Sequence, residues 1–292
     1  MEPFSKGTRG PFETLVLRDK HALVELIPAR GGIVSRFCVE GREVLYMDEG
    51  TLFDVTKNVR GGVPVLFPIA GKLTKDTLQT HLGPRTIAQH GFARKLPWEL
   101  LPLGDGPSAT LRLVPDESAL GLFPYDGFDL RVTYALRGDT LAVTTELRHR
   151  CTTDLPLHLG FHPYFALPPG SKGSAWVVTD ATRAWNNRAG AEEPFAGWAF
   201  GEEEVDLHLL DHGVLRPDGQ PGTSAVLSAA GRDLVRLDLD PVFATLVVWT
   251  LPGRDFVCVE PWTGPADAPN TELAKYLHRR DTFRGRWSVT AL

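Results

Sequence analysis

Long hydrophobic runs, an excess of positive charge and cysteine are all scarce in this 292-residue chain. No apolar run approaches the roughly 20 residues that a membrane helix needs, and the polar residues 1–10 lack the apolar segment of a secretory signal. A net charge of −5 and a pI near 6.0 leave no basic footprint for nucleic acid or an anionic membrane. The sequence therefore predicts a cytoplasmic protein that binds neither nucleic acid nor membrane.

Cysteine and the common cofactor motifs are too sparse to organise a site. Cys38, Cys151 and Cys258 lie far apart, and their odd number fits a reducing compartment better than a disulfide framework. Cys258 precedes Glu260 by two residues, and with no partnering base nearby it indicates packing rather than a nucleophile. The chain also has no phosphate-binding glycine loop and no Gly-x-Ser-x-Gly nucleophile elbow. We therefore expect no cofactor.

Glycine and proline are instead plentiful, at 29 and 23 residues, which is typical of many turns between short strands. Apolar and polar residues alternate over residues 128–136 and 140–148, on either side of an Arg-Gly-Asp turn, and predict a hairpin. Helical periodicity is confined to residues 271–277. The pattern favours an all-β fold, a large antiparallel β-sandwich, with one domain over residues 1–292. The other predicted strands are residues 22–27, 33–39, 43–46, 108–114, 225–228, 234–239, 245–250, 256–259 and 286–292.

The eight residues from His158 to Phe165 concentrate two histidines, three aromatic residues, a glycine and a proline. On an extended strand alternate residues share a face, so both histidines would line one side, with apolar side chains on the other. A strand of this kind is expected beside a pocket. His158 and His162 are four apart, but no helix holds them and no glutamate lies between them, so we expect no metal.

Three further clusters combine polar residues with glycine and aromatic residues: residues 60–68 with 71–73, residues 89–94, and residues 258–264. Glu260 is their most unusual member, because it follows an apolar run that indicates a buried strand, and Pro261 is expected to end that strand. A buried carboxylate is costly unless partnered, and such groups often have a perturbed pKa and a function. An ion pair with an arginine is the structural alternative. For His90 and His162 the alternative is a core histidine with satisfied nitrogens.

Together these clusters resemble the aldose 1-epimerase (galactose mutarotase) family. The resemblance rests on His-Gly-Phe-Ala-Arg at residues 90–94, Gly-Phe-His-Pro-Tyr-Phe at 160–165 and Glu-Pro-Trp-Thr-Gly at 260–264, in that order, and it spans roughly residues 20–290. It implies a β-supersandwich with an open sugar-binding cleft. It also implies a monomer or homodimer that interconverts the α- and β-anomers of an aldose without a cofactor.

The resemblance also implies catalytic roles for three residues. His162 is the expected general acid that protonates the ring oxygen, and Glu260 is the expected general base that takes the proton of the anomeric hydroxyl. These two groups are expected on opposite sides of the cleft, with the sugar between them. His90 is the expected second histidine, which binds or orients the sugar near the ring oxygen.

The binding residues implied by the resemblance come from several clusters. Lys72 falls where family members carry an arginine that contacts hydroxyls, and its role stays open. Asp211 is the expected binding aspartate, with Asp206 as the alternative. The side chains expected to contact the sugar through hydroxyls or an apolar face are Gln89, Arg94, Trp262 and Phe165.

Two alternatives to a simple mutarotase remain open. The blocks at residues 60–64 and 90–94 are similar to the hexose-6-phosphate 1-epimerase branch of the family, in which Arg60 and Arg94 would clamp a phosphate. An alternative of a different class is a non-catalytic carbohydrate-binding or sugar-sensing protein on the same scaffold. A paired acid and base favours an enzyme, because binding alone does not need both.

Overall fold

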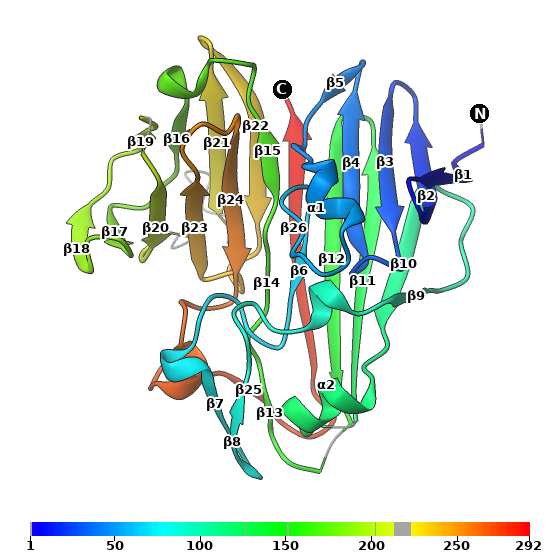
Figure 1. Ribbon diagram of the computed structural model, residues 1–292, viewed down its shortest axis with the longest axis vertical. Helices are drawn as coiled ribbons and strands as arrows, with labels where there is room; N and C mark the ends of the chain where they lie inside the picture. The colour runs from blue at the N-terminus through cyan, green and yellow to red at the C-terminus, as the bar shows by residue number, and fades with distance from the viewer. Residues whose placement is uncertain (1, 126, 151, 202, 213–222) are drawn as a thin grey trace.

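The computed structural model (Figure 1) describes residues 2–125, 127–150, 152–201, 203–212 and 223–292. Within these ranges the named strands pair antiparallel, and α-helix is confined to α1 (Glu49–Phe53) and α2 (Glu117–Leu122). The predicted all-β antiparallel fold is confirmed. No helix in the described ranges is long and apolar enough to cross a membrane.

The largest sheet has nine strands in the order β19-β16-β21-β22-β26-β12-β11-β10-β9. The hairpin predicted near its centre is present: Arg137 pairs with Thr140, and Gly138 between them has a φ of 54° that glycine adopts without strain. The strands of this sheet are β9 (Trp98–Leu100), β10 (Ser108–Leu113), β11 (Phe128–Arg137), β12 (Thr140–His149), β16 (Trp176–Val178), β19 (Trp198–Ala199), β21 (Thr223–Ala229), β22 (Arg232–Leu239) and β26 (Thr282–Ala291).

A second sheet of eight strands has the order β18-β17-β20-β23-β24-β14-β6, and β15 pairs with β24 beside β14. Strands from five distant parts of the chain meet in it, which is what brings the predicted site residues together. Its strands are β6 (Val65–Leu66), β14 (Gly160–Phe161), β15 (Tyr164–Ala166), β17 (Arg183–Asn186), β18 (Ala191–Pro194), β20 (Val205–Leu209), β23 (Thr245–Thr250) and β24 (Phe256–Trp262).

The N-terminal residues form a third sheet, in which five strands follow one another in chain order and which contacts β11 of the largest sheet. These strands are β1 (Phe4–Arg9), β2 (Phe12–Asp19), β3 (Ala22–Ile27), β4 (Ile33–Val39) and β5 (Arg42–Glu43). Two small pairs complete the sheets: β7 (Thr77–Thr80) with β8 (Gly83–Thr86), and β13 (Leu155–Pro156) with β25 (Tyr276–Leu277).

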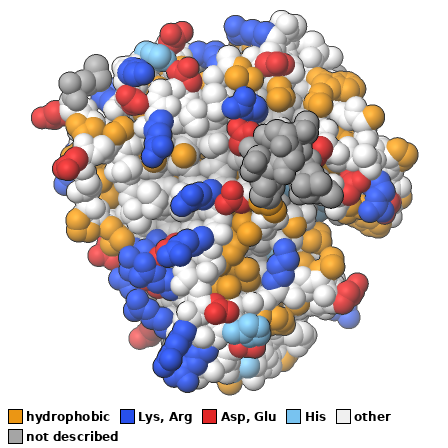
Figure 2. Space-filling model, turned by 180° about the vertical axis from the view of Figure 1, so that it is seen from behind, with side chains coloured by type: hydrophobic (Ala, Val, Ile, Leu, Met, Phe, Trp, Pro, Cys, Tyr) orange, Lys and Arg blue, Asp and Glu red, His pale blue; other side chains and the backbone are white. Residues whose placement is uncertain are grey.

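One hydrophobic cluster joins the three large sheets. Leu17 of β2, Val132 of β11 and Leu246 of β23 all belong to it, and each is fully buried. Because successive strand residues point to opposite faces, the other face of β23 and β24 is left to line a cavity. Seen from behind, charged side chains of both signs are interspersed over the surface of the molecule (Figure 2).

Three details of the sequence prediction are wrong. Residues 271–277 form no α-helix; a 3₁₀ turn at Ala268–Asn270 precedes them, and β25 occupies their end. Pro261 does not end its strand, because β24 continues to Trp262 and Pro261 pairs with Leu246. Of residues 43–46 only the first belongs to a named strand, β5. The assignment of the whole chain to one domain stays a prediction.

Candidate active site

The floor of the site lies where β24 pairs with β14 and β15. Two pairs fix the register there: Gly160 with Trp262, and Tyr164 with Cys258. Along the chain, His162 lies midway between Gly160 and Tyr164. Glu260 lies midway between their partners, so His162 and Glu260 stand opposite each other. Pro163 lies at the break between β14 and β15, where its missing N–H leaves the ladder interrupted. Directly opposed residues on neighbouring strands are in reach of one another, and His162 Nε2 is 3.3 Å from Glu260 Oε1.

The next strands extend this arrangement into two rows of side chains. Val247 of β23 pairs with both Glu260 and His208, while Trp249 pairs with Cys258 and Asp206. The first row is His162, Glu260, Val247 and His208; the second is Tyr164, Cys258, Trp249 and Asp206.

These rows form the floor of a cavity of about 1040 Å³. Its walls include residues from three separate segments, 48–60, 71–74 and 89–94. All the floor residues except Cys258 line it. Eight of the residues predicted for the site also line it: His90, His162, Glu260, Arg60, Lys72, Gln89, Arg94 and Trp262.

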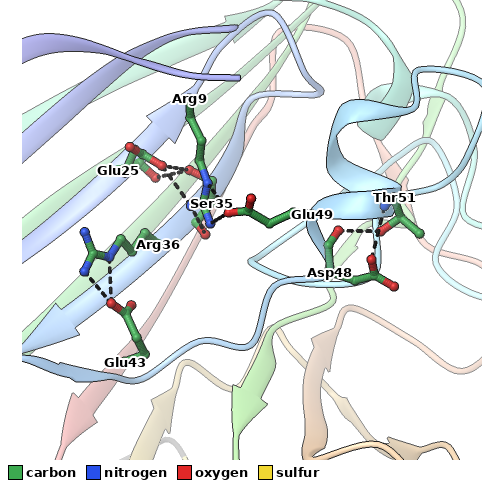
Figure 3. A network of polar contacts seen from close by, with 8 residues as sticks. All are labelled: Arg9, Glu25, Ser35, Arg36, Glu43, Asp48, Glu49 and Thr51. Carbon is green, nitrogen blue, oxygen red and sulfur yellow. Dashed lines mark hydrogen bonds and ion pairs between the residues drawn. The ribbon is translucent and has the colours of Figure 1, made fainter. Parts of the chain in front are cut away.

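The helix α1 belongs to one wall. Asp48 caps its first turn by accepting a hydrogen bond from the Thr51 N–H at 3.2 Å, and both residues line the cavity. Glu49 points the other way, towards Arg9 (Figure 3). The buried Arg30 holds residues 51–57 of this wall in place. Its guanidinium donates to the backbone carbonyls of residues 51, 52, 54 and 57 at 2.8–3.1 Å.

Burial controls the protonation of the central pair. It lowers the pKa of His162 to about 3, with help from the positive charge of Arg94. Burial also raises the pKa of Glu260 well above its ordinary value, and the negative charge of Asp206 adds to this effect. Both shifts favour the uncharged forms, a protonated carboxyl beside a neutral imidazole. The second carboxyl oxygen of Glu260 also has a partner, because Trp262 donates its Nε1–H to Glu260 Oε2 at 3.2 Å.

The predicted placement of His162 and Glu260 on opposite sides of a cleft is wrong. Glu260 lies in β24 and His162 in the link between β14 and β15, and their 3.3 Å contact leaves no room for a sugar ring between them. The space for a ligand lies over the pair instead. Neighbouring groups suit the predicted chemistry, because the anomeric and ring oxygens of a pyranose are bonded to the same carbon.

His90 is held as a hydrogen-bond donor. Its backbone has a φ of 65°, an uncommon conformation for a non-glycine residue, and it exchanges two bonds with Gly71. Gly71 N–H donates to His90 Nδ1 at 3.0 Å, and His90 N–H donates to Gly71 O at 2.8 Å. An Nδ1 that accepts leaves the hydrogen on Nε2. Burial and the neighbouring His162 lower the pKa of His90 well below its ordinary value, so it stays neutral.

Aromatic rings enclose the central pair. The Tyr164 ring stacks on His162 with centroids 4.6 Å apart, and Trp249 meets both edge-on. Trp262 packs edge-on against His90 at 5.7 Å and lines the cavity as predicted. The expectation that Phe165 offers an apolar face to a sugar is wrong, because its side chain is fully buried in the main hydrophobic cluster.

His158 does not face the cavity with His162, although strand alternation placed them together. The chain leaves regular strand geometry before Gly160, and the His158 ring bridges two loops beneath the site. Its Nδ1 accepts from Ala70 N–H at 3.2 Å, and its Nε2 lies 3.1 Å from Gly264 O. Burial lowers the pKa of His158 to about 4. His158 is therefore a core histidine with both ring nitrogens in hydrogen bonds, a state that the sequence left open only for His90 and His162.

Four predicted binding residues lie at the cavity with different degrees of freedom. Arg94 donates to the Gln89 carbonyl at 2.8 Å, while its buried Nε has no partner among the described residues. Burial lowers the pKa of the Arg94 guanidinium. Arg60 and Lys72 lie nearer the solvent, and Lys72 is 4.0 Å from Asp76.

Asp211, the expected binding aspartate, does not line the cavity. Its carboxylate accepts hydrogen bonds from the backbone N–H groups of Thr182 and Arg183, at 2.9 and 3.0 Å. The alternative, Asp206, does line it, 3.2 Å from His208 Nε2 and 2.8 Å from Asn187 Nδ2.

Sequence reasoning missed His208 and Trp249 as cavity residues. The signal for His208 was available: in Val-Asp-Leu-His-Leu, residues 205–209, the three apolar side chains share one face and leave Asp206 and His208 on the other. Trp249 alternates in the same way with its buried neighbours in β23.

One group of three possible metal ligands occurs in the part of the chain that the structure describes. It consists of His162, Cys258 and Glu260, whose ligand atoms all lie within 4.8 Å of one another.

An imidazole and a carboxyl group thus lie in contact under an open polar cavity on an antiparallel β-sandwich. The chain belongs to the aldose 1-epimerase family, whose sequence model matches residues 13–262. It is therefore an isomerase of the epimerase or mutarotase type, as the sequence predicted.

Individual relatives agree with this family. The Slr1438 protein from Synechocystis sp. PCC 6803 is 30% identical, with a TM-score of 0.86 over 95% of this chain and 94% of that one. A galactose mutarotase related enzyme from Lactobacillus acidophilus shares the fold, with a TM-score of 0.77 over 96% of this chain and 97% of that one, at 18% identity. A protein of Cenchrus ciliaris, provisionally named glucose-6-phosphate 1-epimerase, is 30% identical over 177 residues, 56% of this chain and 50% of that protein.

Proposed function

We propose that this protein interconverts the α- and β-anomers of an aldopyranose, with Glu260 as general base and His162 as general acid. The observation that carries the proposal is the 3.3 Å contact between Glu260 Oε1 and His162 Nε2 on the cavity floor. Two buried groups that can exchange one proton suit a reaction that moves one proton off a sugar and another onto it. No nucleophile takes part in this chemistry.

In the proposed reaction, every proton that leaves or joins the sugar is exchanged with Glu260 or His162. In ring opening the Glu260 carboxylate takes the proton of the anomeric hydroxyl, the C1–O5 bond breaks as C1 becomes an aldehyde, and the His162 imidazolium gives its proton to O5. Rotation about C1–C2 turns the other aldehyde face towards O5. In closure the O5 hydroxyl adds to C1, its proton returns to His162, and Glu260 returns a proton to O1.

The neutral pair is the form that accompanies the open aldehyde. After ring opening Glu260 is protonated and His162 is neutral, which is the state that burial favours. Binding of the closed sugar requires the proton to sit on His162 instead, and the direct contact provides the path for that transfer. The protonation that burial favours is therefore that of the open-aldehyde state, and the closed-sugar state is reached by proton transfer across the contact.

The cavity walls supply groups for the remaining sugar atoms. His90 presents its Nε2–H beside His162, with ring centroids 5.5 Å apart, and suits the orienting role near O5. Asp206 can accept from hydroxyl groups on the far side of the floor. Trp262 and Trp249 offer aromatic surface to the apolar face of a pyranose.

The direct test is the rate of anomer exchange, measured by polarimetry or by NMR exchange spectroscopy on freshly dissolved sugar. The wild-type protein should accelerate exchange, and Glu260→Gln should remove most of the acceleration. Saturable sugar binding without acceleration by the wild-type protein would instead support a non-catalytic sugar-binding protein. A chelator should leave the rate of the metal-free protein unchanged, because neither group needs a metal.

A hexose 6-phosphate is the second candidate substrate, because two arginines lie on the appropriate side of the floor. C6 is attached to C5, the ring atom next to O5, so a 6-phosphate lies on the His162 side when O5 faces His162. Arg94 and Arg60 both line the cavity, and their positive charges act on Tyr164, whose ring stacks on His162. The provisional name of the Cenchrus relative points to the same substrate. Comparing kcat/KM for glucose and glucose 6-phosphate separates the two candidates.

The cytoplasmic location and the monomeric or homodimeric state predicted from the sequence remain part of this proposal. Sedimentation of the purified chain tests the second.

A further inference from the structure

The floor of the cavity carries a thiol that the proposed reaction does not use. Cys258 precedes Glu260 by two residues on the same strand face and is fully buried beneath the cavity. It packs with Tyr164, Phe256 and the partly buried Trp249. Its sulfur nevertheless lies within 4.8 Å of a ligand atom of both His162 and Glu260.

We infer that His162, Cys258 and Glu260 form a binding site for a thiophilic divalent ion such as Zn²⁺, and that this ion inhibits the enzyme. The site goes beyond the proposed function, because the ion would bind whether or not the protein is a mutarotase. Only the inhibition depends on that function.

The geometry of the three groups supports the inference. Ligand atoms bound tetrahedrally to one Zn²⁺ lie about 3.3–3.8 Å apart, given bond lengths of about 2.0–2.3 Å. His162 Nε2 and Glu260 Oε1 are already 3.3 Å apart. Neighbouring strands hold all three residues, since Tyr164, two residues from His162, pairs directly with Cys258. The sulfur lies within 4.8 Å of both other ligand atoms, so about 1 Å of movement brings it to the tetrahedral spacing.

The ligand types select the kind of ion. A thiolate, an imidazole and a carboxylate are the ligands that Zn²⁺ takes in proteins, whereas Ca²⁺ and Mg²⁺ require six or more oxygen ligands. Three protein ligands leave one position open, and His162 and Glu260 face the cavity, so water or a sugar hydroxyl can fill it. The same opening gives the ion its entry path.

Inhibition follows from which groups the ion occupies. A bound ion takes the lone pair of His162 and the carboxylate of Glu260, which are the proposed acid and base. It also fills the part of the cavity over the pair, so the ion and the sugar should exclude each other.

The test uses Co²⁺ as a spectroscopic substitute for Zn²⁺ in the full-length wild-type protein. A cobalt–thiolate bond gives a near-ultraviolet charge-transfer band, and four-coordinate Co²⁺ gives intense visible bands. We expect both, and we expect one equivalent of Zn²⁺ to abolish them. The absence of a thiolate band would overturn the inference whatever the outcome of the mutarotase assay.

Matched cysteine variants assign the band. Cys258→Ala should lose it, while Cys38→Ala, which removes another buried thiol far along the chain in β4, should keep it. Loss of a residue that only supports a metal ligand weakens metal binding about 10- to 100-fold. Loss of a ligand itself should cost more, so Cys258→Ala should weaken Zn²⁺ binding by at least about 100-fold. Cys258→Ser, which nearly preserves side-chain volume, serves if the alanine variant does not fold.

Inhibition is measured as the ratio of anomer-exchange rates with and without Zn²⁺ in each variant, so any change in basal rate cancels. Wild type and Cys38→Ala should be inhibited competitively with sugar, and Cys258→Ala should resist. Equal inhibition of the wild type and Cys258→Ala would exclude the thiol as a ligand and overturn the inference.

Discussion

Two polar regions of this molecule lie on either side of α1, and they differ in how completely their charged and polar groups are paired. Behind α1, the N-terminal sheet carries a network around a second cavity of about 500 Å³ (Figure 3). Arg9 bonds Glu25 at 3.0 Å and Glu49 at 2.8 Å, Ser35 donates to Glu25 at 2.7 Å, and Arg36 pairs with Glu43. Each charged side chain of this network therefore has an oppositely charged neighbour.

The floor of the main cavity leaves its polar groups incompletely satisfied. Glu260 contacts the neutral His162 and the Trp262 N–H, with no cation at hydrogen-bond distance among the described residues. His162 Nδ1 and Arg94 Nε are buried without a partner in the same set of residues. An unsatisfied buried group costs stability, so this arrangement indicates function where the paired network indicates structure.

Exchanging one carboxylate in each region should give the largest contrast. Glu260→Gln should lower the catalysed rate of anomer exchange by about 10²- to 10⁴-fold. Its thermal stability near pH 7 should not fall: the folded pKa of Glu260 is raised, so the wild type loses stability as pH rises above 4.5, and glutamine removes that loss.

Glu25→Gln is the matched control in the paired network. It should leave anomer exchange unchanged but lower the free energy of unfolding by about 1–2 kcal/mol, because Arg9 and Ser35 lose a charged partner. Urea denaturation measures this loss in the free energy of unfolding. The comparison between regions fails if Glu25→Gln loses activity or if Glu260→Gln loses only stability.

Exchanging one arginine in each region should sharpen the substrate assignment. Arg94→Gln should lower kcat/KM for glucose 6-phosphate about 10- to 100-fold, the value of one charge-assisted phosphate contact, and affect glucose less. Arg36→Gln, in the paired network, should alter neither value. Equal losses of Arg94→Gln on both sugars would argue against a phosphate contact.

The two candidate aspartates should separate binding from folding. Asp206→Asn should raise the KM of the sugar by about 10-fold, as expected for the loss of one hydrogen bond to a charged group. Asp211→Asn should leave KM unchanged and reduce the midpoint of thermal unfolding, because two backbone N–H groups exchange a charged carboxylate acceptor for a neutral amide oxygen. Identical KM values for Asp206→Asn and the wild type would remove Asp206 from the site.

A further expected effect concerns acid stability. The folded pKa of His158 is about 4, below its ordinary value of 6.5, so the unfolded chain binds more protons in between. The free energy of unfolding should therefore fall as pH decreases from 6.5 towards 4, by about 1.4 kcal/mol per pH unit from this residue. Denaturant titrations at several pH values should show a shallower slope for His158→Gln. Parallel slopes would contradict the assignment.

Local patterns carried much of the fold. The hairpin of β11 and β12 followed from alternation around Gly138, and residues 245–250 were predicted with the observed bounds of β23. The prediction for residues 271–277 was wrong because a few apolar residues match a helical turn by chance, and pairing of Leu155 with Leu277 decides the outcome. The prediction that Pro261 ends its strand was wrong for a related reason. Pairing of β24 with strands on both sides outweighs one missing N–H.

By itself the sequence determined the all-β class, the family and eight residues of the cavity, because side-chain alternation and short motifs are local properties of a chain. Only the tertiary structure decided which aspartate faces the cavity, that His158 is structural, and that His162 touches Glu260. Those facts depend on strand register between segments roughly 100 residues apart, as in the pairing of Tyr164 with Cys258, and a shift of one residue would turn each side chain to the other face.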